Sequence, residues 1–481
     1  MESLFTGRKR ELQDLKSLLA KKSASLVVIR GRRRIGKSRL VDEFAKNMNY
    51  FTFTGLPPEK GTTAQSQREE FARQLRVALR LPGLKADDWG DLFTMLSSAI
   101  SNDPVIVMLD EITWMGSKDD SFLGKLKVVW DLYFSKMPNL ILILCGSVSS
   151  WIEKNILSST GFLGRVSLKI HLRELSLLEC SQLLEKIGFR GSVQEKFMVL
   201  SLTGGIPWYI EQINPKFMAL ENIHRLCFTP NGLFVDEFKS IFHDLFGKRS
   251  KNYRKIVEFL ANGPADNTTI ANNIHYASSG KLSEYLEELV LAGYVGREHT
   301  WSLKTGKESR NSRYRIRDNF LRFYLKYMLP NLSKIERDSF KNTSLLSIPS
   351  WESIMGLQFE NLVINNRDLL LQELGIRPEE VVYDNPFFQK KVLKSQGCQI
   401  DYLIQTRFGN LFVCEIKFSR NPIATGVIEE MQTRLADLQA PRGYAKIPVL
   451  IHVNGVTPEI EESGFFSRII DFGNFLHIKT I

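Results

Sequence analysis

The chain is poor in cysteine and has no long hydrophobic run, and each shortage argues against a class of protein. Its five cysteines, at positions 145, 180, 227, 398 and 414, show neither the paired spacing of zinc ligands nor a disulfide framework. The longest apolar runs, such as 140–145, are far too short to span a bilayer. The N-terminus lacks the charged lead and apolar core of a secretion signal. We therefore expect a cytoplasmic protein with no membrane partner.

Length and charge set broad limits on what remains. A chain of 481 residues suggests about three domains, and 43% hydrophobic with 24% charged residues is ordinary for a globular protein. The formal net charge is +11. Such an excess favours an acidic partner, of which nucleic acid is the obvious case, but a solubilising surface explains it equally well.

The most informative motif is a glycine-rich loop between an apolar strand and a helix. Gly31–Ser38 follows the apolar run 26–29 and precedes a helix-like segment, 38–46. It has the pattern of a glycine, four residues and Gly-Lys-Ser, in which backbone N–H groups and the helix N-terminus cradle phosphates. Lys37 is expected to reach the β- and γ-phosphates, and the Ser38 hydroxyl to bind Mg²⁺.

Two carboxylates follow a second apolar segment, 105–109, which is typical of a parallel strand buried on both faces. At its end, Asp110 is expected to hold the hydration shell of Mg²⁺ and Glu111 to polarise the attacking water. The alternative is an ordinary acidic loop. About 70 residues after a phosphate loop, the catalytic interpretation is favoured.

Two further polar residues follow the apolar strand 140–145. Ser147 is placed to sense the γ-phosphate or position water, although a hydroxyl there is also a common helix cap. Arg165 lies in the glycine-rich stretch 161–165, where it is a candidate finger for a neighbour's nucleotide. An exposed surface arginine is the alternative.

In this order, the motifs resemble the archaeal-type ATPases of the AAA+/STAND branch over residues 1–235. The resemblance includes three elements: the arginines 32–34, the segment 144–147 and Phe5–Leu12. The last is similar to the family's opening sequence motif, which lies near the adenine. The resemblance also includes Gly164-Arg165 and Gly204-Gly205-Ile206-Pro207, the latter typical of a helical lid beside the nucleotide. It implies ATP and Mg²⁺ as cofactors, a homo-oligomer, and a Ser38 that replaces the usual threonine. The residues implied to contact the nucleotide are Arg8, Gly31, Arg34, Gly36, Lys37, Ser38, Arg39, Asp110, Ser147 and Pro207.

Residues 248–328 have the order of a winged helix, with three helices followed by a β-hairpin. Helices are expected at 253–260, 268–274 and 282–291, and the hairpin at 293–316. The third helix carries Glu284, Glu287 and Glu288, which would repel phosphate. The hairpin is more basic, with Lys304, Lys307, Arg310, Arg313, Arg315 and Arg317. Any DNA contact is therefore expected through the wing, and a packing module is the alternative.

The last segment contains a second set of catalytic residue types. A helix is expected from 356, and strands at 398–404 and 411–418 are joined by a turn. Glu415 and Lys417 project from one face of the second strand, and hairpin pairing can bring Asp401 beside them. Two carboxylates that hold Mg²⁺, with a lysine that positions or activates water, are typical of metal-dependent phosphodiester cleavage.

Asp401, thirteen residues and then Glu415-Ile416-Lys417 resemble the restriction-endonuclease-like, or PD-(D/E)xK, superfamily. The resemblance covers 351–481. Glu360, from the preceding helix, is a candidate to complete the metal shell, and Mn²⁺ is an alternative metal. Ile400 stands where the pattern often has proline. Gln432 and Arg434, on the following helix, are candidates for contacts with the phosphate backbone.

The sequence therefore predicts an α/β protein with five segments. These are a phosphate-loop ATPase core with a parallel sheet at 1–170, a helical lid at 171–240, a winged helix at 241–328, a linker at 329–350 and a nuclease-like domain at 351–481. The leading hypothesis is an ATP-controlled, Mg²⁺-dependent DNA endonuclease. The alternative is a nucleotide-dependent switch that binds DNA or protein without cutting; a housekeeping ATPase with an inert tail is least favoured.

Overall fold

The computed structural model describes residues 5–80, 83, 85–100, 104–246, 250–276, 279–389 and 397–477. Contacts divide the chain into two compact units, which are treated separately below. The first comprises Met1–Glu174, Ser240–Ser250 and Leu291–Gly293, and the second the remainder. In the described parts, no helix combines the length and apolar character needed to cross a membrane.

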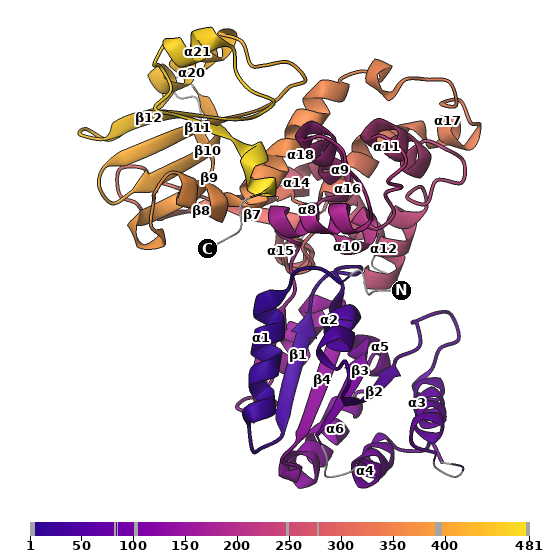
Figure 1. The fold of residues 1–481 in the computed structure, drawn as a ribbon. Helices are drawn as coiled ribbons and strands as arrows, with labels where there is room; N and C mark the ends of the chain where they lie inside the picture. The colour runs from indigo at the N-terminus through magenta and orange to yellow at the C-terminus, as the bar shows by residue number, and fades with distance from the viewer. Residues whose placement is uncertain are drawn as a thin grey trace. The chain divides into compact units, whose positions relative to one another are not determined.

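The first unit is built on a parallel five-stranded sheet of order β2-β3-β4-β1-β5 (Figure 1). Its strands are β1 (Ser25–Arg30), β2 (Asn49–Thr54), β3 (Val105–Asp110), β4 (Leu140–Gly146) and β5 (Val166–His171). Strands β1, β3 and β4 are almost entirely buried and mostly apolar. This is typical of a parallel sheet that helices cover on both faces. Lys37, Ser38, Asp110, Glu111 and Ser147 lie at or just after the carboxyl ends of β1, β3 and β4, whereas Arg165 directly precedes β5.

Among the described residues, seven α-helices precede or connect the strands of this sheet. They are α1 (Lys9–Ser17), α2 (Lys37–Phe44), α3 (Ala64–Leu79), α4 (Trp89–Ala99), α5 (Ile112–Met115), α6 (Phe122–Leu132) and α7 (Ser149–Ile152). The long connection between β2 and β3 contains α3 and α4, which lie beyond the β2 edge (Figure 1). Phe71, Trp89, Phe93 and Phe122 bring their rings together in the core that joins α3, α4 and α6.

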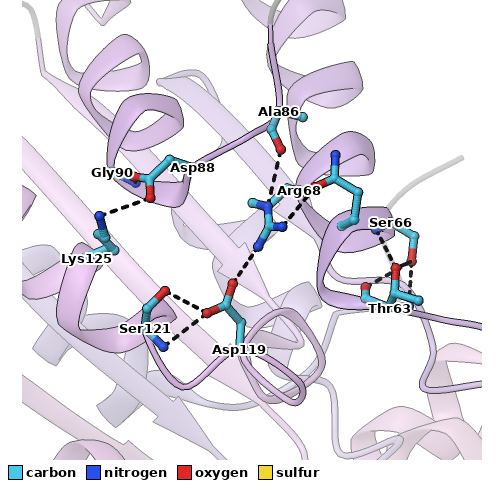
Figure 2. Close-up of polar contacts among 10 residues, drawn as sticks. Thr63, Ser66, Arg68, Ala86, Asp88, Gly90, Asp119, Ser121 and Lys125 are labelled. Carbon is cyan, nitrogen blue, oxygen red and sulfur yellow. Dashed lines mark hydrogen bonds and ion pairs between the residues drawn. The ribbon is translucent and has the colours of Figure 1, made fainter.

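Polar contacts also fix this connection (Figure 2). Arg68 on α3 donates to the carbonyl of Ala86 at 3.2 Å and pairs with Asp119 at 2.6 Å. Asp88 caps α4 through the Gly90 N–H at 2.7 Å and pairs with Lys125 on α6 at 3.0 Å. Arg68 is largely buried, so its hydrogen bonds hold the loop before α4 against the segment that leads into α6.

The second unit begins with a run of helices, and further along the chain helices alternate with short strands. Its helices are α8 (Leu177–Lys186), α9 (Val193–Thr203), α10 (Pro207–Ile210), α11 (Ala219–Cys227), α13 (Ser250–Leu260), α14 (Asn267–Asn273), α15 (Ser279–Leu291), α16 (Asn319–Phe323), α17 (Leu332–Glu336), α18 (Trp351–Asn365), α19 (Arg367–Glu373), α20 (Gly426–Asp437) and α21 (Pro458–Glu462), with α12 (Glu237–Phe246) and the ends of α13 and α15 shared with the first unit. A small antiparallel sheet of order β6-β8-β7 contains β6 (Ala265–Asp266), β7 (Val295–Trp301) and β8 (Glu308–Ile316).

The C-terminal sheet has five strands in the order β13-β12-β11-β10-β9. They are β9 (Val381–Gln389), β10 (Cys398–Thr406), β11 (Asn410–Phe418), β12 (Ala445–Val453) and β13 (Arg468–Asp471). The first three strands are antiparallel, and β11, β12 and β13 are parallel. Val413 and Leu450 share a core with Met431 of α20, so α20 covers one face of this sheet.

The tip of the β7–β8 hairpin is part of this C-terminal core. Trp301 and Leu303 are buried in the same apolar cluster as Leu403 and Met431. The Trp301 indole donates to Gln405 Oε1 at 2.6 Å, and the Gln405 amide donates back to the Leu303 carbonyl at 2.9 Å. The hairpin therefore does not project freely as a wing.

Two of the hairpin arginines that we expected to face DNA are engaged inside the unit, which corrects that expectation. Arg315 is 5% exposed, pairs with Glu298 and donates to the amide oxygen of Asn361 on α18. Arg313 lies over the ring of Phe388, 3.9 Å from its centroid. A buried, paired arginine has no surface left for phosphate, whereas Lys304 and Lys307 remain exposed. The Arg310 side chain lies outside the described part of the chain.

The segment 329–350 is more structured than the linker that its polar sequence suggests. Ile335, Phe340 and Leu345 are buried. The Phe340 ring packs 5.2 Å from that of Phe228, and the Phe340 carbonyl is 2.8 Å from Nε2 of His224 on α11. Apolar residues spaced too irregularly for one helix face therefore still anchor this segment to the helices of the second unit.

Candidate functional site

The phosphate loop requires glycine at Gly31 and favours it at Gly36. Gly31 has φ +154°, and a Cβ added there would lie 2.5 Å from the backbone oxygen of Leu172. Gly36, which precedes α2, has φ +91°, a region that favours glycine. Between them, Arg34 adopts a left-handed φ of 68°. The loop can therefore bring backbone N–H groups close to a ligand at the start of α2.

Lys37 is held over this loop by backbone oxygens. Its ammonium donates to the carbonyls of Gly31 at 3.0 Å and Arg32 at 3.1 Å, and the side chain is 6% exposed. The Lys37 ammonium is therefore placed to bind a phosphate in the loop. A charged phosphate oxygen is a stronger hydrogen-bond acceptor than the two carbonyls that hold the ammonium here.

Ser38 and Asp110 meet, as expected for two residues that share a metal. The Ser38 hydroxyl donates to Asp110 Oδ2 at 2.8 Å. The other carboxylate oxygen, Oδ1, accepts the Glu111 N–H at 3.0 Å, which fixes the orientation of Asp110. A hydroxyl and a carboxylate oxygen are hard donors of the kind that Mg²⁺ selects, so the residues present fit that ion.

Glu111 and Ser147 also come together, from the ends of β3 and β4. The Ser147 hydroxyl is 2.9 Å and 3.1 Å from the two carboxylate oxygens of Glu111, and its N–H is 3.3 Å from one of them. The backbone of Glu111 has a left-handed conformation, with φ 47°. The Ser147 side chain is buried, with 4% of its surface exposed. Ser147 was predicted to sense the γ-phosphate or position water, and its hydrogen bonds also restrain the orientation of the Glu111 carboxylate.

The remaining predicted nucleotide residues have different surroundings. Arg8 is 6% exposed, with one donor 3.3 Å from the Ile35 carbonyl, so it packs against the phosphate loop. Arg39 lies half-buried in the first turn of α2, and Pro207 begins α10 in the second unit.

Arg165 is bound within its own chain. Its Nε and Nη2 atoms donate to the two carboxylate oxygens of Asp131 at 2.7 and 2.9 Å, and Lys127 pairs with the same carboxylate at 2.9 Å. These two cations hold the pKa of Asp131 at about 2. Arg165 must therefore leave Asp131 before it could act on a neighbour's nucleotide.

A second polar cluster lies on the β10–β11 hairpin. Asp401 Oδ2 accepts the Ile416 N–H at 3.0 Å, which ties the two strands beside Glu415. Lys417 Nζ is 3.0 Å from Glu415 Oε1 and 2.6 Å from Glu430 on α20. Glu415 is only 1% exposed, and its contact with the Lys417 ammonium offsets part of the cost of burying a carboxylate.

Arg434 on α20 forms ion pairs with both carboxylates. Its Nη1 atom contacts Glu415 Oε2 and lies 3.6 Å from Asp401 Oδ1. Gln432, two residues earlier, is exposed. The guanidinium therefore sits between the two groups that were predicted to share a metal.

Glu360 lies near Asp401, but the described side chains do not form a three-carboxylate group, so its place in a metal shell stays a prediction. No group of three or more His, Cys, Asp or Glu side chains among the described residues is placed to hold a metal ion. Burial, and then the nearby Asp401, raise the pKa of Glu360 to about 7. Burial also raises the pKa of Asp401, although Arg434 opposes that rise. The carboxylates of Asp401 and Glu415 are hard oxygen donors, and two of them would fit Mg²⁺ because this ion usually keeps several waters.

The helix that carries Glu360 is anchored by buried amides that sequence reasoning missed. Gln358 donates to the carbonyls of Ser201 on α9 at 2.8 Å and Asn319 on α16 at 2.6 Å. Asn319 donates in turn to the Ser201 and Gln358 carbonyls, at 3.1 and 3.0 Å. The available signal was two amides, Gln358 and Asn361, three apart on the otherwise apolar face of α18.

Comparisons with known proteins bear on the first cluster. Residues 5–213 match the family described as an ATPase domain predominantly from Archaea. An uncharacterized protein of Methanocaldococcus jannaschii is 23% identical over 365 residues, which are 75% of this chain and 76% of that protein. The Walker-type ATPase of Pyrococcus abyssi is 17% identical with a TM-score of 0.50, over 67% of this chain and 96% of that one. The ORC2 protein of Aeropyrum pernix is 14% identical with a TM-score of 0.39, over 70% and 96%.

These matches and the site geometry agree for residues 5–213. The family match, the parallel sheet and the phosphate loop support an ATPase domain, which binds ATP and usually uses Mg²⁺. The predicted α/β fold and ATPase are confirmed at this level. The winged helix and the nuclease-like domain stay predictions.

Proposed function

We propose that the chain is an ATP-controlled, Mg²⁺-dependent DNA endonuclease. The observation that carries the proposal is the convergence of Asp401, Glu415 and Lys417 on one hairpin, with Asp401 tied to the Ile416 N–H. This set has the residue types and spacing of metal-dependent phosphodiester cleavage. The net charge of +11 supports an acidic polymer as substrate.

In the proposed reaction, each residue has a separate task. Asp401 and Glu415 would hold Mg²⁺, which supplies hydroxide at neutral pH and stabilises charge on the phosphate. Lys417, 3.0 Å from Glu415, positions the attacking water through its ammonium. Arg434 lies close enough to bind the scissile phosphate once it leaves the two carboxylates. Burial of Glu415 keeps bulk water away from this carboxylate.

The proposed control by ATP rests on the helices of the second unit. In the ATPases that residues 1–235 resemble, the Gly204–Pro207 type of element belongs to a lid beside the nucleotide. Helix α9, which ends just before this element, is joined to α18 through Gln358 and Asn319. A movement of the lid on ATP binding would be transmitted to α18 at Gln358, which is two residues from Glu360. Lys37, Ser38, Asp110 and Glu111 would bind and hydrolyse ATP, with Ser147 orienting Glu111.

The test is cleavage of duplex, single-stranded, branched and RNA substrates with Mg²⁺ or Mn²⁺, with and without ATP. We expect metal-dependent DNA cleavage by the wild type and none by Lys417→Ala. Lys341→Ala, an exposed lysine in the same unit, is the matched control and should cleave normally. Equal cleavage by the wild type and Lys417→Ala, or none by either on any substrate, would refute the proposal.

The second candidate is a nucleotide-dependent switch that binds DNA or protein without cutting. It is favoured by one observation: Arg434 and Lys417 already satisfy the carboxylates of Asp401 and Glu415. Calorimetric titration with Mg²⁺ and Mn²⁺ separates the two. A nuclease should bind a metal that is lost in Asp401→Ala, whereas a binding module should show no such site.

We also propose that ATP hydrolysis takes place in a homo-oligomer in which Arg165 reaches a neighbour's nucleotide. The exposed Leu163, 72% accessible in the same loop, supports a surface that a second copy could cover. Specific ATPase activity should rise with protein concentration in the wild type. A concentration-independent activity that Arg165→Ala leaves unchanged would reject this assembly.

A further inference from the structure

A cavity of about 720 Å³ lies at the end of the C-terminal sheet, where strands β12 and β13 finish. Residues of β12, β13, α19 and α21 line it, together with the turn of 3₁₀-helix η9 (Phe472–Leu476) that follows β13. Its volume is within the range of small-molecule sites in proteins. Neither the ATPase site nor the Asp401, Glu415 and Lys417 set includes a residue of this lining.

The charge of the cavity opposes that of the whole chain. Three carboxylates line it, those of Glu373, Glu461 and Asp471, and the lining contains no lysine or arginine. The chain as a whole has 64 Lys and Arg against 53 Asp and Glu. An acidic cavity repels DNA phosphate and attracts a cation, so this place is unsuited to the substrate proposed for the neighbouring strands.

A buried imidazole without a partner points to a ligand. His452 on β12 is 4% exposed and lines the cavity, and its Nδ1 atom has no hydrogen-bond partner among the described residues. It pairs in register with Asp471 on β13, so the two side chains share one face of the sheet. A buried polar atom left unpaired costs free energy, which a ligand that donates a hydrogen bond would recover.

The lining selects an organic cation over a metal ion. No set of three or more His, Cys, Asp or Glu side chains in the described ranges is placed to hold a metal. Asp471 already uses one oxygen to accept the Gly473 N–H at 2.8 Å. Val456, Ile469 and Phe475 add apolar wall, which suits the methylene stem of an alkyl ammonium or guanidinium.

We propose that this cavity binds an alkyl ammonium or guanidinium compound, which the carboxylates of Glu373, Glu461 and Asp471 attract and whose N–H groups can donate to Nδ1 of His452. The cationic group could belong to a free polyamine or to a basic side chain of a peptide, which present the same chemistry. Burial lowers the pKa of His452, which favours the neutral ring that can accept a hydrogen bond.

Calorimetric titration of the full chain with spermidine and with N-acetyl-arginine amide tests the site without DNA or nucleotide. Saturable binding is expected, and the tighter probe identifies the source. Glu373→Gln combined with Glu461→Gln should weaken it by about tenfold, since each exposed carboxylate contributes under about 1 kcal/mol. Both glutamates are exposed, so the double variant should fold.

The matched control is Glu336→Gln combined with Glu379→Gln, two exposed glutamates outside the cavity with the same change in net charge. It should bind both probes like the wild type. His452→Phe, which keeps a ring but removes Nδ1, should also weaken binding while thermal unfolding reports that the fold is kept. The proposal is overturned if neither probe saturates at millimolar concentration, if the control weakens binding equally, or if Mn²⁺ competes at the cavity with higher affinity than either probe.

Discussion

Replacement of Gln358 should loosen the contact between helices α9 and α18 selectively. Gln358 is fully buried and donates two hydrogen bonds, to Ser201 O and Asn319 O. Loss of the two bonds costs about 2 kcal/mol at about 1 kcal/mol each. Truncation to alanine adds about 2 kcal/mol for the lost packing and the cavity. We therefore expect Gln358→Ala to destabilise this contact by about 4 kcal/mol.

Gln358→Met separates the two contributions because it keeps most of the side-chain volume. It also removes Gln358 Oε1, a buried acceptor without a partner among the described residues, which lowers the net cost. We expect about 1–2 kcal/mol for this variant. Gln372→Ala, an exposed glutamine on α19, is the control and should change stability by less than about 0.5 kcal/mol.

Hydrogen exchange read by mass spectrometry is the assay, because two units make a single unfolding curve hard to interpret. A cost of about 4 kcal/mol corresponds to roughly a thousandfold faster exchange of the protected amides in 193–203 and 351–365. Peptides from β1 should exchange as in the wild type. Unchanged exchange in α9 and α18, or equal acceleration in β1, would refute this account of the network.

Three further predictions follow from the sites. Lys37→Met should abolish the ATP-induced rise in melting temperature, since it removes the ammonium that the loop aims at phosphate; an unchanged rise would exclude this phosphate role. Arg434→Met should tighten Mn²⁺ binding at pH 8 by about tenfold, measured by calorimetry against exposed Arg442→Met, because a charge-assisted contact worth about 1.5 kcal/mol or more no longer competes; weaker binding would show that Arg434 supports the site. The raised pKa of Glu360, about 7, means that the metal-free protein should lose stability as pH rises from about 4.5 to 7, because the unfolded carboxyl ionises first. Glu360→Gln should flatten that slope in denaturant titrations, and an unchanged slope would assign it to other groups.

Sequence reasoning succeeded where the chemistry is local. The phosphate loop, Lys37 and Ser38 lie within eight residues, and their spacing alone fixes a strand, a turn and a helix N-terminus. The structure also brings Asp110 into hydrogen-bond contact with Ser38, because the carboxyl ends of parallel strands meet at one edge of a sheet. The pairing of Ser147 with Glu111 follows from the same rule, but which of them orients the other depends on side-chain geometry.

The failures concern contacts between distant parts of the chain. Arg315 looks like a surface cation in sequence, and only the tertiary fold shows that Glu298 and Asn361 enclose it. Arg434 was expected at phosphate because nothing in the sequence measures its distance from Asp401. Glu360 was predicted to complete a metal shell from its place on the preceding helix, and helix α18 brings it near Asp401 without forming a three-carboxylate group among the described residues.

The hairpin tip that carries Trp301 and Leu303 determines where this protein can be divided into fragments that fold. Since both residues complete the core under β10, a gene fragment that starts at the expected boundary near residue 351 lacks part of the interior it must fold around. Recombination at that boundary would leave Gln405 without its indole partner and expose Leu403. A fragment that is meant to keep this core intact must therefore contain the hairpin together with the C-terminal sheet.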